Sequence, residues 1–342
     1  MKFNLRTAMA TPTLQLPQGK EPTIIECPFC GGTMLVGNDK FECFSCFKSG
    51  DIVDFLVERD GISHKKADRK SERIKPSIEA ENEIFRVNKL AMKYFEDKLD
   101  KNKYLSKRAV SDDSIKAFHL GFAPFDGEGL KKYLLNNIVR ESVLIQSGLF
   151  NSELKPFFRN RVMFPVFDEK GRVAGFGGRR IDDNKESPKY INSPENMVFH
   201  KKDILYGLDK AAGNDTVYLV EGYMDVISLH QAGITNAVAA LGTAVGVRHC
   251  TLLRELGVKK IILALDSDEP GVKSALKTVP VLKKYFDVKV IHLENAKDPD
   301  EYIKKNGVEK FRSLKQSSGD SFLVCNSEEK DRISLALNLL LQ

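Results

Sequence analysis

From residue 215 onward, short apolar segments alternate with segments of helical periodicity, and this alternation restricts the possible folds more than any other feature of the chain. The apolar segments have the length of strands, and the periodic segments repeat apolar residues every three or four positions. The expected strands lie at 216–220, 237–240, 260–265 and 288–292, and the expected helices at 224–232, 247–256 and 271–285. Short strands interleaved with helices predict a doubly wound parallel sheet in an α/β fold.

Acidic residues follow three of these expected strands at the point where each strand ends. Glu221 follows the first strand, and Asp266 and Asp268 follow the third. Asp298 and Asp300 follow the last strand by a short loop. Ligands of doubly wound folds bind beyond the carboxyl ends of strands, and clustered carboxylates suit hard cations such as Mg²⁺ or Mn²⁺. The sequence therefore predicts a divalent-cation site at this edge, although Asp300, like the nearby Asp225, can also cap a helix.

Four of the six cysteines form two C-x-x-C pairs near the N-terminus, at Cys27, Cys30, Cys43 and Cys46. Each pair can chelate an ion from a tight turn, and four thiolates complete the tetrahedral shell of zinc. Because a closed shell has no open position, one structural zinc ion is expected. A thioredoxin-like redox pair is the alternative, and the second pair disfavours it. The phenylalanines around the pairs can stack on single-stranded nucleic acid or form the small core of the module.

The net charge of +6 is unevenly distributed along the chain. Residues 61–110 contain 14 Lys and Arg against eight Asp and Glu. This bias suggests a polyanion partner, although a solvated helix surface also explains it. The apolar segments are too short to cross a membrane, and the N-terminus lacks the pattern of a secretory signal. We therefore expect a cytoplasmic protein without a membrane partner.

Composition and periodicity divide the chain into six segments. They are an irregular arm (1–22), a zinc-binding domain (23–60), a basic linker (61–80), a helical segment followed by a basic α+β subdomain (81–214), the acid-bearing α/β subdomain (215–315) and a short helical tail (316–342). A helix is expected at about 81–99, and a second one after Ser111. The chain is thus expected to join a small, β-rich zinc ribbon to a larger core with two halves.

Four short segments stand out in the C-terminal half: EGYMDV at 221–226, LGTA at 241–244, DSD at 266–268 and DPDE at 298–301. They resemble the Toprim domain of the bacterial-type replicative DNA primases. Toprim domains also occur in topoisomerases, recombination mediators and nucleases, so the segments before it are more specific. The segments similar to the primase core are YLSKR at 104–108, LGFAP at 120–124, RNRVMFP at 159–165, GFGGR at 175–179, PKYINSPE at 188–195, FHK at 199–201 and LYG at 205–207. The cysteine pairs fit the family's zinc-binding domain.

The resemblance implies template-directed synthesis of short RNA primers on single-stranded DNA from NTPs. A 3′-hydroxyl would attack the α-phosphate of the next NTP, and pyrophosphate would leave. The catalytic acids that hold one to three Mg²⁺ or Mn²⁺ ions would be Glu221, Asp266, Asp268 and Asp298, with Asp300 assisting. The basic face that receives template and nucleotides would contain Arg159, Arg161, Arg179, Lys189 and Lys201. The zinc module would hold the template start site, and a replicative helicase is the expected protein partner.

The chain departs from the family pattern in three respects. Cys30 stands where the family often has histidine, and the interval between the cysteine pairs is shorter than usual. The chain also ends soon after the Toprim segment, which leads us to expect a short form of the phage, plasmid or mobile-element type, without the usual helicase-binding domain.

Two other classes of function remain open. A Toprim nuclease or topoisomerase is one, although no tyrosine-nucleophile domain is recognisable for strand passage. A non-enzymatic DNA-binding loader of the recombination-mediator type is the other, although such proteins lack segments like those at 159–207.

Overall fold

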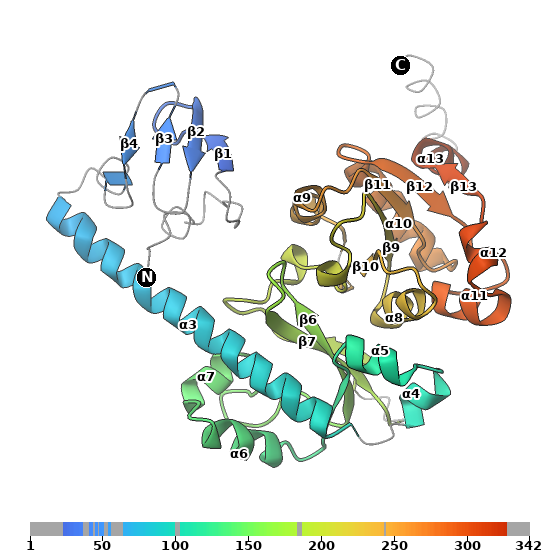
Figure 1. The fold of residues 1–342 in the computed structure, drawn as a ribbon, viewed down its shortest axis with the longest axis horizontal. Helices are drawn as coiled ribbons and strands as arrows, with labels where there is room; N and C mark the ends of the chain where they lie inside the picture. The colour runs from blue at the N-terminus through green and yellow to red at the C-terminus, as the bar shows by residue number, and fades with distance from the viewer. Residues whose placement is uncertain are drawn as a thin grey trace. The chain divides into compact units, whose positions relative to one another are not determined.

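The computed structural model describes residues 23–36, 41–43, 45–46, 48–50, 54–55, 64–99, 103–182, 187–242 and 244–326 (Figure 1). The chain forms two compact units, Met1–Asn82 and Glu83–Gln342. The arm expected at 1–22 and the end of the expected tail at 327–342 lie outside the described residues. No helix in the described ranges is both long enough and apolar enough to span a membrane.

The first unit contains a small antiparallel sheet. Its strands, in the order in which they pair, are β1 (Thr23–Glu26), β2 (Thr33–Val36), β3 (Phe41–Cys43) and β4 (Ser49–Gly50). The rings of Phe29, Phe41 and Phe55 contact one another, with centroids 5.4 to 6.0 Å apart. Because Phe41 and Phe55 are buried, these two aromatic residues form the core of the module and not a stacking surface. The expected β-rich ribbon is confirmed.

Helix α3 (His64–Asp97) begins well before residue 81, where the apolar periodicity predicts a helix to start. The segment at 61–80 that we expected as a basic linker is therefore helical from His64 onward. This segment is rich in Lys, Arg, Glu and Ala, which favour helices, but it has too few apolar residues to show a periodic stripe. Periodicity alone detects only the part of α3 that has an apolar face.

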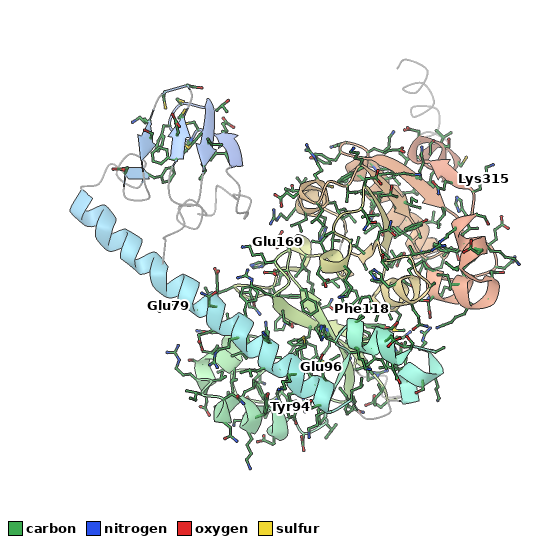
Figure 2. All side chains as sticks on the ribbon, in the orientation of Figure 1. Glu79, Tyr94, Glu96, Phe118, Glu169 and Lys315 are labelled. Atoms are coloured by element: carbon green, nitrogen blue, oxygen red, sulfur yellow. The ribbon has the colours of Figure 1, made fainter. Side chains whose placement is uncertain are left out.

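The second unit begins with an antiparallel sheet and the helices on it. The strands are β5 (Gly121–Ala123), β6 (Arg161–Phe167), β7 (Val173–Arg180) and β8 (Tyr190–Asn192), paired in that order. The helices are the C-terminal part of α3, α4 (Lys103–Lys107), α5 (Asp112–Ala117), α6 (Glu128–Asn136) and α7 (Glu141–Gln146). Tyr94, which is labelled in Figure 2, lies on α3. Its ring centroid is 5.5 Å from that of Tyr133 of α6. Ser111 caps α5 through its side chain, as expected.

A five-stranded sheet forms the rest of the second unit (Figure 1). Its strands, in spatial order, are β10 (Ala237–Ala239), β9 (Thr216–Val220), β11 (Lys260–Leu263), β12 (Asp287–Ile291) and β13 (Gln316–Ser318). The first four are parallel, and β13 is antiparallel to β12. The strand order reverses between β9 and β11, which creates a topological switch point there. The predicted doubly wound sheet is confirmed.

The fifth strand corrects the expectation of a purely helical tail after residue 315. Strand β13 belongs to the sheet, and helix α13 (Gly319–Asn326) follows it. The sequence of β13 is Gln-Ser-Ser, which contains no β-branched or apolar residue. A short polar edge strand of this kind gives no alternating pattern that sequence reading could detect.

Helices cover both faces of the parallel sheet. One face packs on α8 (Tyr223–Gln231), α11 (Pro299–Asn306) and α12 (Val308–Arg312). The other face packs on α9 (Val247–Glu255), α10 (Glu269–Leu282) and α13. The 3₁₀ turns Lys201–Asp203 and Leu208–Lys210 connect the two sheets. The result is the three-layer α/β arrangement that the sequence predicts.

The two halves of the second unit share a core beside the start of α8. The ring of Phe164 in β6 stacks on the ring of Tyr223, with centroids 4.9 Å apart. The Tyr223 hydroxyl donates to Asn192 Oδ1 of β8 at 2.5 Å, and Asn192 Nδ2 donates to the Leu241 carbonyl. These contacts hold the turn that carries Glu221 in a fixed position against the antiparallel sheet.

Gly177 of β7 should tolerate no side chain, because Tyr223 occupies the space beside it. A Cβ atom there would lie 2.3 Å from Tyr223 Cζ, and the buried ring has nowhere to move. We expect Gly177→Ala to lower the free energy of unfolding by about 1 to 3 kcal/mol, measured by urea denaturation. Gly246→Ala is the matched control, because no atom lies within 4 Å of its Cβ position. Equal stabilities of the two variants would contradict this packing.

Candidate active site and metal centre

The switch point of the parallel sheet brings Glu221 and Asp266 together. Glu221 directly follows β9, and Asp266 lies three residues after the end of the adjacent strand β11. The Asp266 backbone N–H donates to Glu221 Oε1 at 3.0 Å. Both carboxylates are half-buried. Sequence reasoning placed these two acids at one edge, and the strand pairing gives the reason.

Asp268 and Asp298 reach the same edge from the first turns of two helices. Asp268 Oδ1 caps α10 by accepting from the Gly271 N–H at 3.1 Å. Asp298 Oδ1 caps α11 by accepting from the Glu301 N–H at 2.8 Å. Each cap uses one carboxylate oxygen, so the second oxygen remains to face a ligand. The sequence predicted caps at Asp225 and Asp300, whereas the caps of α10 and α11 are Asp268 and Asp298. For these two acids, capping is compatible with ligand binding.

Burial and mutual repulsion shift the pKa values of these acids. Burial is the main cause that raises the pKa of Glu221, and Asp268 and Asp298 add to it. Burial, Glu221 and Asp298 raise the pKa of Asp266 to about 7, while Lys297 opposes the shift. The four carboxylates thus form one electrostatic group that is short of positive charge. Such a group gains from a bound cation.

Asp300 differs from its expected role as an assisting metal ligand. Its side chain is only 3% exposed. It accepts from Arg108 Nη1 at 2.9 Å and pairs with Lys304 Nζ at 2.6 Å. Two cations therefore already neutralise it, and the contact with Arg108 joins α11 to the residue that follows α4. The sequence could not show this pairing, because Arg108 lies nearly two hundred residues away.

Two charged residues that sequence reasoning did not assign to the site also lie at this edge. Asp225 of α8 is buried, and its carboxylate accepts from the Gly222 N–H at 3.1 Å. Burial, together with the charges of Asp298 and Asp266, raises its pKa well above the usual value. Lys297 places its Nζ 3.8 Å from a carboxylate oxygen of Asp266 and 3.8 Å from one of Asp268. The sequence signal for Asp225 was its place in the EGYMDV segment, and the signal for Lys297 was its place next to Asp298.

Arg161 does not join the expected basic face. Its side chain is buried and donates to the carbonyls of Gly178 and Pro188, both at 3.1 Å, and to Ser187 Oγ at 2.6 Å. Burial and the nearby Arg180 lower its pKa. The guanidinium N–H groups of Arg161 therefore bind the segment before β8 and hold it in place. The sequence could not show the carbonyls around Arg161, because Gly178 and Pro188 lie 17 and 27 residues away along the chain.

Other cations do lie beside the acids. The Arg179 guanidinium stacks on Tyr104, with Cζ 3.7 Å from the ring centroid. Burial lowers the pKa of Lys189, and the nearby charges of Arg179, Arg108 and Lys297 lower it further, while Asp298 opposes them. A group of positive charges therefore borders the acidic edge.

The remaining two predicted cations are placed differently. Arg159 is exposed just before β6. Lys201 lies beside Glu195, whose Oε1 accepts the Lys201 backbone N–H at 3.2 Å.

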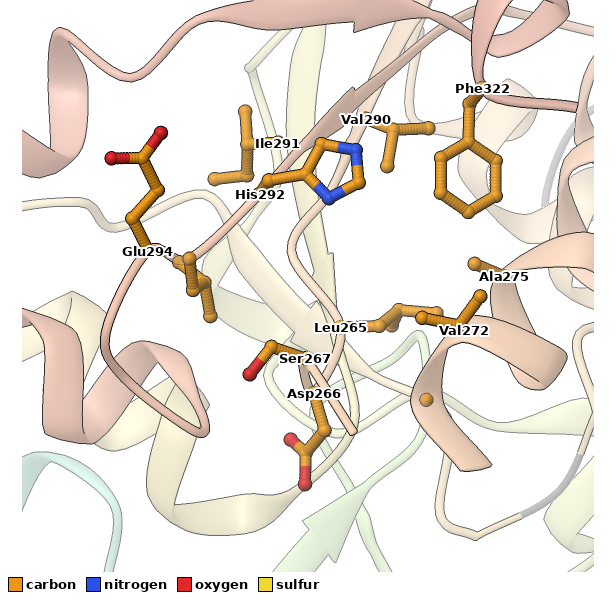
Figure 3. A pocket seen from close by; sticks show the side chains of 12 residues that line it. Leu265, Asp266, Ser267, Val272, Ala275, Val290, Ile291, His292, Glu294 and Phe322 are labelled. Carbon is orange, nitrogen blue, oxygen red and sulfur yellow. The ribbon is translucent and has the colours of Figure 1, made fainter. Parts of the chain in front are cut away.

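Two cavities adjoin the acids. One of about 330 Å³ is bordered by Glu221, Lys273 and Lys277. The other, of about 140 Å³, lies behind the loop after β11, between Val290 and Phe322. In Figure 3 the Asp266 carboxylate points away from the apolar side chains of this second cavity.

The four cysteines of the first unit form a compact group whose sulfur atoms all lie within 4.8 Å of one another. The Cys27 and Cys46 sulfurs are 3.9 Å apart, and those of Cys30 and Cys43 are 3.7 Å apart. A tetrahedral zinc site with Zn–S bonds of about 2.3 Å places its sulfurs about 3.8 Å apart, so the geometry fits zinc.

The surroundings of these sulfurs also suit thiolate ligands. The Cys43 sulfur accepts from the N–H groups of Ser45 and Cys46, both at 3.4 Å. Burial opposes charge on Cys43, but these donors outweigh it and lower its pKa to about 6. Burial raises the pKa of Cys27 to about 12, so its thiolate needs the metal for stability.

Among the described residues, no group of three or more acids is gathered as closely as these cysteines. A looser group of acids still fits magnesium, which usually binds one or two carboxylates and completes its octahedral shell with water and substrate phosphates. The oxygen donors of Glu221, Asp266, Asp268 and Asp298 are of the type that Mg²⁺ and Mn²⁺ prefer.

Divalent-ion affinity should fall as the pH falls through 7. The pKa of Asp266 is about 7 without a metal, so protons compete with the cation for this carboxylate. Between pH 8 and pH 6 the ionised fraction of such a group drops roughly tenfold, and we expect a similar loss of Mn²⁺ affinity. Titration followed by Mn²⁺ electron paramagnetic resonance measures it. Asp266→Asn should remove most of the pH dependence, and an unchanged profile in this variant would contradict the assignment.

Comparison with known proteins agrees with this arrangement. Residues 89–212 match the family model of the DNA primase catalytic core, N-terminal domain, and residues 218–303 match the Toprim-like model. A DNA primase of Clostridium acetobutylicum is 38% identical over 321 residues, which is 85% of this chain and 53% of the relative. The chain thus spans about half the length of the curated relatives it matches.

Solved structures extend the similarity to the first unit. The zinc-binding and RNA polymerase domains of the Aquifex aeolicus primase match 98% of this chain and 96% of that chain, with a TM-score of 0.66 and 28% identity. A DnaG primase catalytic domain bound to ssDNA matches 72% of this chain and 82% of that chain, with a TM-score of 0.63 and 32% identity. With a zinc-type cysteine module, an antiparallel core sheet and an acid-edged Toprim sheet in the order of these relatives, the chain belongs to the family of bacterial DNA primases.

Proposed function

We propose that this chain is a DNA-directed RNA polymerase of the primase type, which makes short RNA primers on single-stranded DNA for replication. The observation that carries the proposal is the meeting of Glu221, Asp266, Asp268 and Asp298 at the switch point of the parallel sheet, with a group of positive charges beside them. Nucleotidyl transfer needs this combination, because a divalent cation and a polyphosphate must lie at one place.

The reaction that we propose joins two nucleotides. The 3′-oxygen of one nucleotide attacks the α-phosphorus of an NTP, the bond to the β-phosphate oxygen breaks, and pyrophosphate leaves. Mg²⁺ or Mn²⁺ bound by the four acids would lower the pKa of the attacking hydroxyl and neutralise the leaving pyrophosphate. One to three such ions would bind, and Asp300 would keep α11 in place through Arg108 and Lys304.

The cations beside the acids would position the nucleic acid and the NTP. Arg179 and Lys189 lie near the acidic edge and suit the phosphates of the incoming nucleotide. Arg159 and Lys201 would contact the template backbone, which positions a strand without reading its sequence. Arg161 would support this surface through its hydrogen bonds to the Gly178 and Pro188 carbonyls. The related catalytic domain solved with ssDNA supports a single-stranded DNA template for this chain.

The four cysteines would hold one structural zinc ion, and the module that it folds would hold the template start site. A replicative helicase is the protein partner that we propose, because primers are needed where DNA is unwound. The location would be the cytoplasm of a bacterium, or of the host if a phage encodes the chain.

The test is primer synthesis on single-stranded DNA from labelled NTPs with Mg²⁺ or Mn²⁺. Short RNA products that depend on the template support the proposal. Failure on a library of templates with either ion, by folded protein that holds its zinc, would overturn it. The same reactions with supercoiled DNA separate the alternatives, because cutting would favour a Toprim nuclease. Binding of DNA without any product would favour a loading protein.

A further inference from the structure

Lys297 stands between two of the proposed metal ligands. Its Nζ lies 3.8 Å from Asp266 Oδ2 and 3.8 Å from Asp268 Oδ2. Both distances are too long for hydrogen bonds, so charge alone holds the ammonium there. The Lys297 side chain is 61% exposed, in contrast to the 18% of Asp266. The ammonium of Lys297 therefore lies against Asp266 and Asp268 from the solvent side.

The backbone fixes Lys297 in this place although its side chain is exposed. The Ser267 N–H donates to the Lys297 carbonyl at 2.9 Å, and the Lys297 N–H donates to Glu301 Oε2 at 2.7 Å. Ser267 Oγ also donates to the Ala296 carbonyl at 2.7 Å. Ser267 lies between Asp266 and Asp268 in the sequence, so these bonds tie the loop after β11 to the loop before α11. These bonds hold the Lys297 backbone where the side chain can reach the carboxylates of both Asp266 and Asp268.

The lysines of α11, in contrast, make closer pairs. Lys304 lies 2.6 Å from Asp300, and Lys305 lies 2.5 Å from Glu301. Lys297 instead shares its charge between two carboxylates at a longer distance. Exposed pairs of this kind are weak and are broken easily by a stronger cation. Its charge nevertheless opposes the rise in the pKa of Glu221 and of Asp266.

We propose that Lys297 is the resident counter-cation of the acidic edge, which neutralises Asp266 and Asp268 until a divalent ion displaces its ammonium. This inference rests on the divalent-cation site of the proposed function. The charge of Lys297 already lowers the pKa of Lys189, so the two ammonium groups interact. The displaced ammonium would remain on the side of the site where we place the nucleotide phosphates. Lys297 is thus a positioning residue that couples metal binding to the charge of the nucleotide side.

The first test is Mn²⁺ affinity of the full chain, measured by electron paramagnetic resonance without nucleotide or DNA. Lys297→Met removes the competitor, so we expect Mn²⁺ to bind about three- to tenfold more tightly than to the wild type. Lys310→Met, which removes one exposed charge from α12, should change the affinity less than twofold. Equal affinities of Lys297→Met and the wild type would overturn the inference and leave the metal site standing.

The second test follows the ammonium itself. Acylation of lysines by a water-soluble ester, read by mass spectrometry, should modify Lys297 faster when Mn²⁺ is bound, whereas Lys310 should not change. If Mn²⁺ leaves the acylation rate of Lys297 unchanged, the proposed displacement of its ammonium is overturned. If neither the wild type nor Asp266→Asn binds Mn²⁺, the metal site of the proposed function is overturned, and this inference with it.

Discussion

Asp266→Asn should lower primer synthesis by about a thousandfold or more, while binding to single-stranded DNA stays within about twofold of the wild type. Asp266 lies at the centre of the acidic edge, where its backbone N–H holds Glu221 and its carboxylate faces Asp298 and Lys297. The substitution keeps the shape of the side chain but removes the charge that would bind the cation. The loss should therefore fall on the chemical step and not on template binding, which we propose for other residues.

The controls separate this effect from misfolding. Asp287→Asn changes an exposed acid at the other end of the sheet, beside Lys289, and should keep full activity. Thermal unfolding of Asp266→Asn without metal should occur at or above the wild-type temperature, because the substitution removes repulsion between carboxylates. Synthesis at more than a tenth of the wild-type rate in Asp266→Asn would show that the cation is held elsewhere.

Removal of zinc should unfold the first unit and leave the second unit folded. The strands β1 to β4 contain two to four residues each, and the aromatic core of the module rests on Phe29, Phe41 and Phe55. Such a module is too small to fold without help, and structural zinc supplies on the order of 10 kcal/mol. The second unit has its own large apolar cores and needs no zinc.

Cys43→Ser and a chelator test this dependence by two routes. After either treatment, hydrogen exchange should become fast at 23–50, while the amides of β9 and β11 remain protected. Zinc content should fall from one ion per chain to near zero. Cys325→Ser, at an exposed cysteine outside the module, should retain the ion. Retained zinc in Cys43→Ser, or protection of 23–50 without zinc, would contradict the tetrathiolate site.

The predictable part of the fold is the part with strong local patterns. The strands and helices between residues 216 and 291 lie within a few residues of their expected positions, because buried parallel strands and amphipathic helices each leave a clear periodicity. The same pattern placed Glu221 and Asp266 at one edge. The cysteine spacing likewise predicted a group that the structure brings within 4.8 Å.

The unpredicted part depends on polar segments and distant contacts. The first turns of α3 and the strand β13 are polar and carry no apolar pattern. Arg161 and Asp300 looked like site residues, but one binds buried carbonyls and the other binds Arg108. Lys297 gained its role from a loop contact with Ser267 that only the folded chain makes. Charged residues in the sequence indicate where a site lies. Their contacts in the folded chain determine which of them can bind a ligand there.

The most direct measurement of the central claim follows both products of the reaction on one single-stranded DNA template. Labelled NTPs report RNA growth, and an enzymatic assay reports pyrophosphate. With Mg²⁺, the zinc-loaded full chain should release one pyrophosphate for each nucleotide added, only with NTPs that the template specifies, and Asp266→Asn should release none above background. No template-dependent RNA from the wild type, or RNA and pyrophosphate formed equally by Asp266→Asn, would contradict the account.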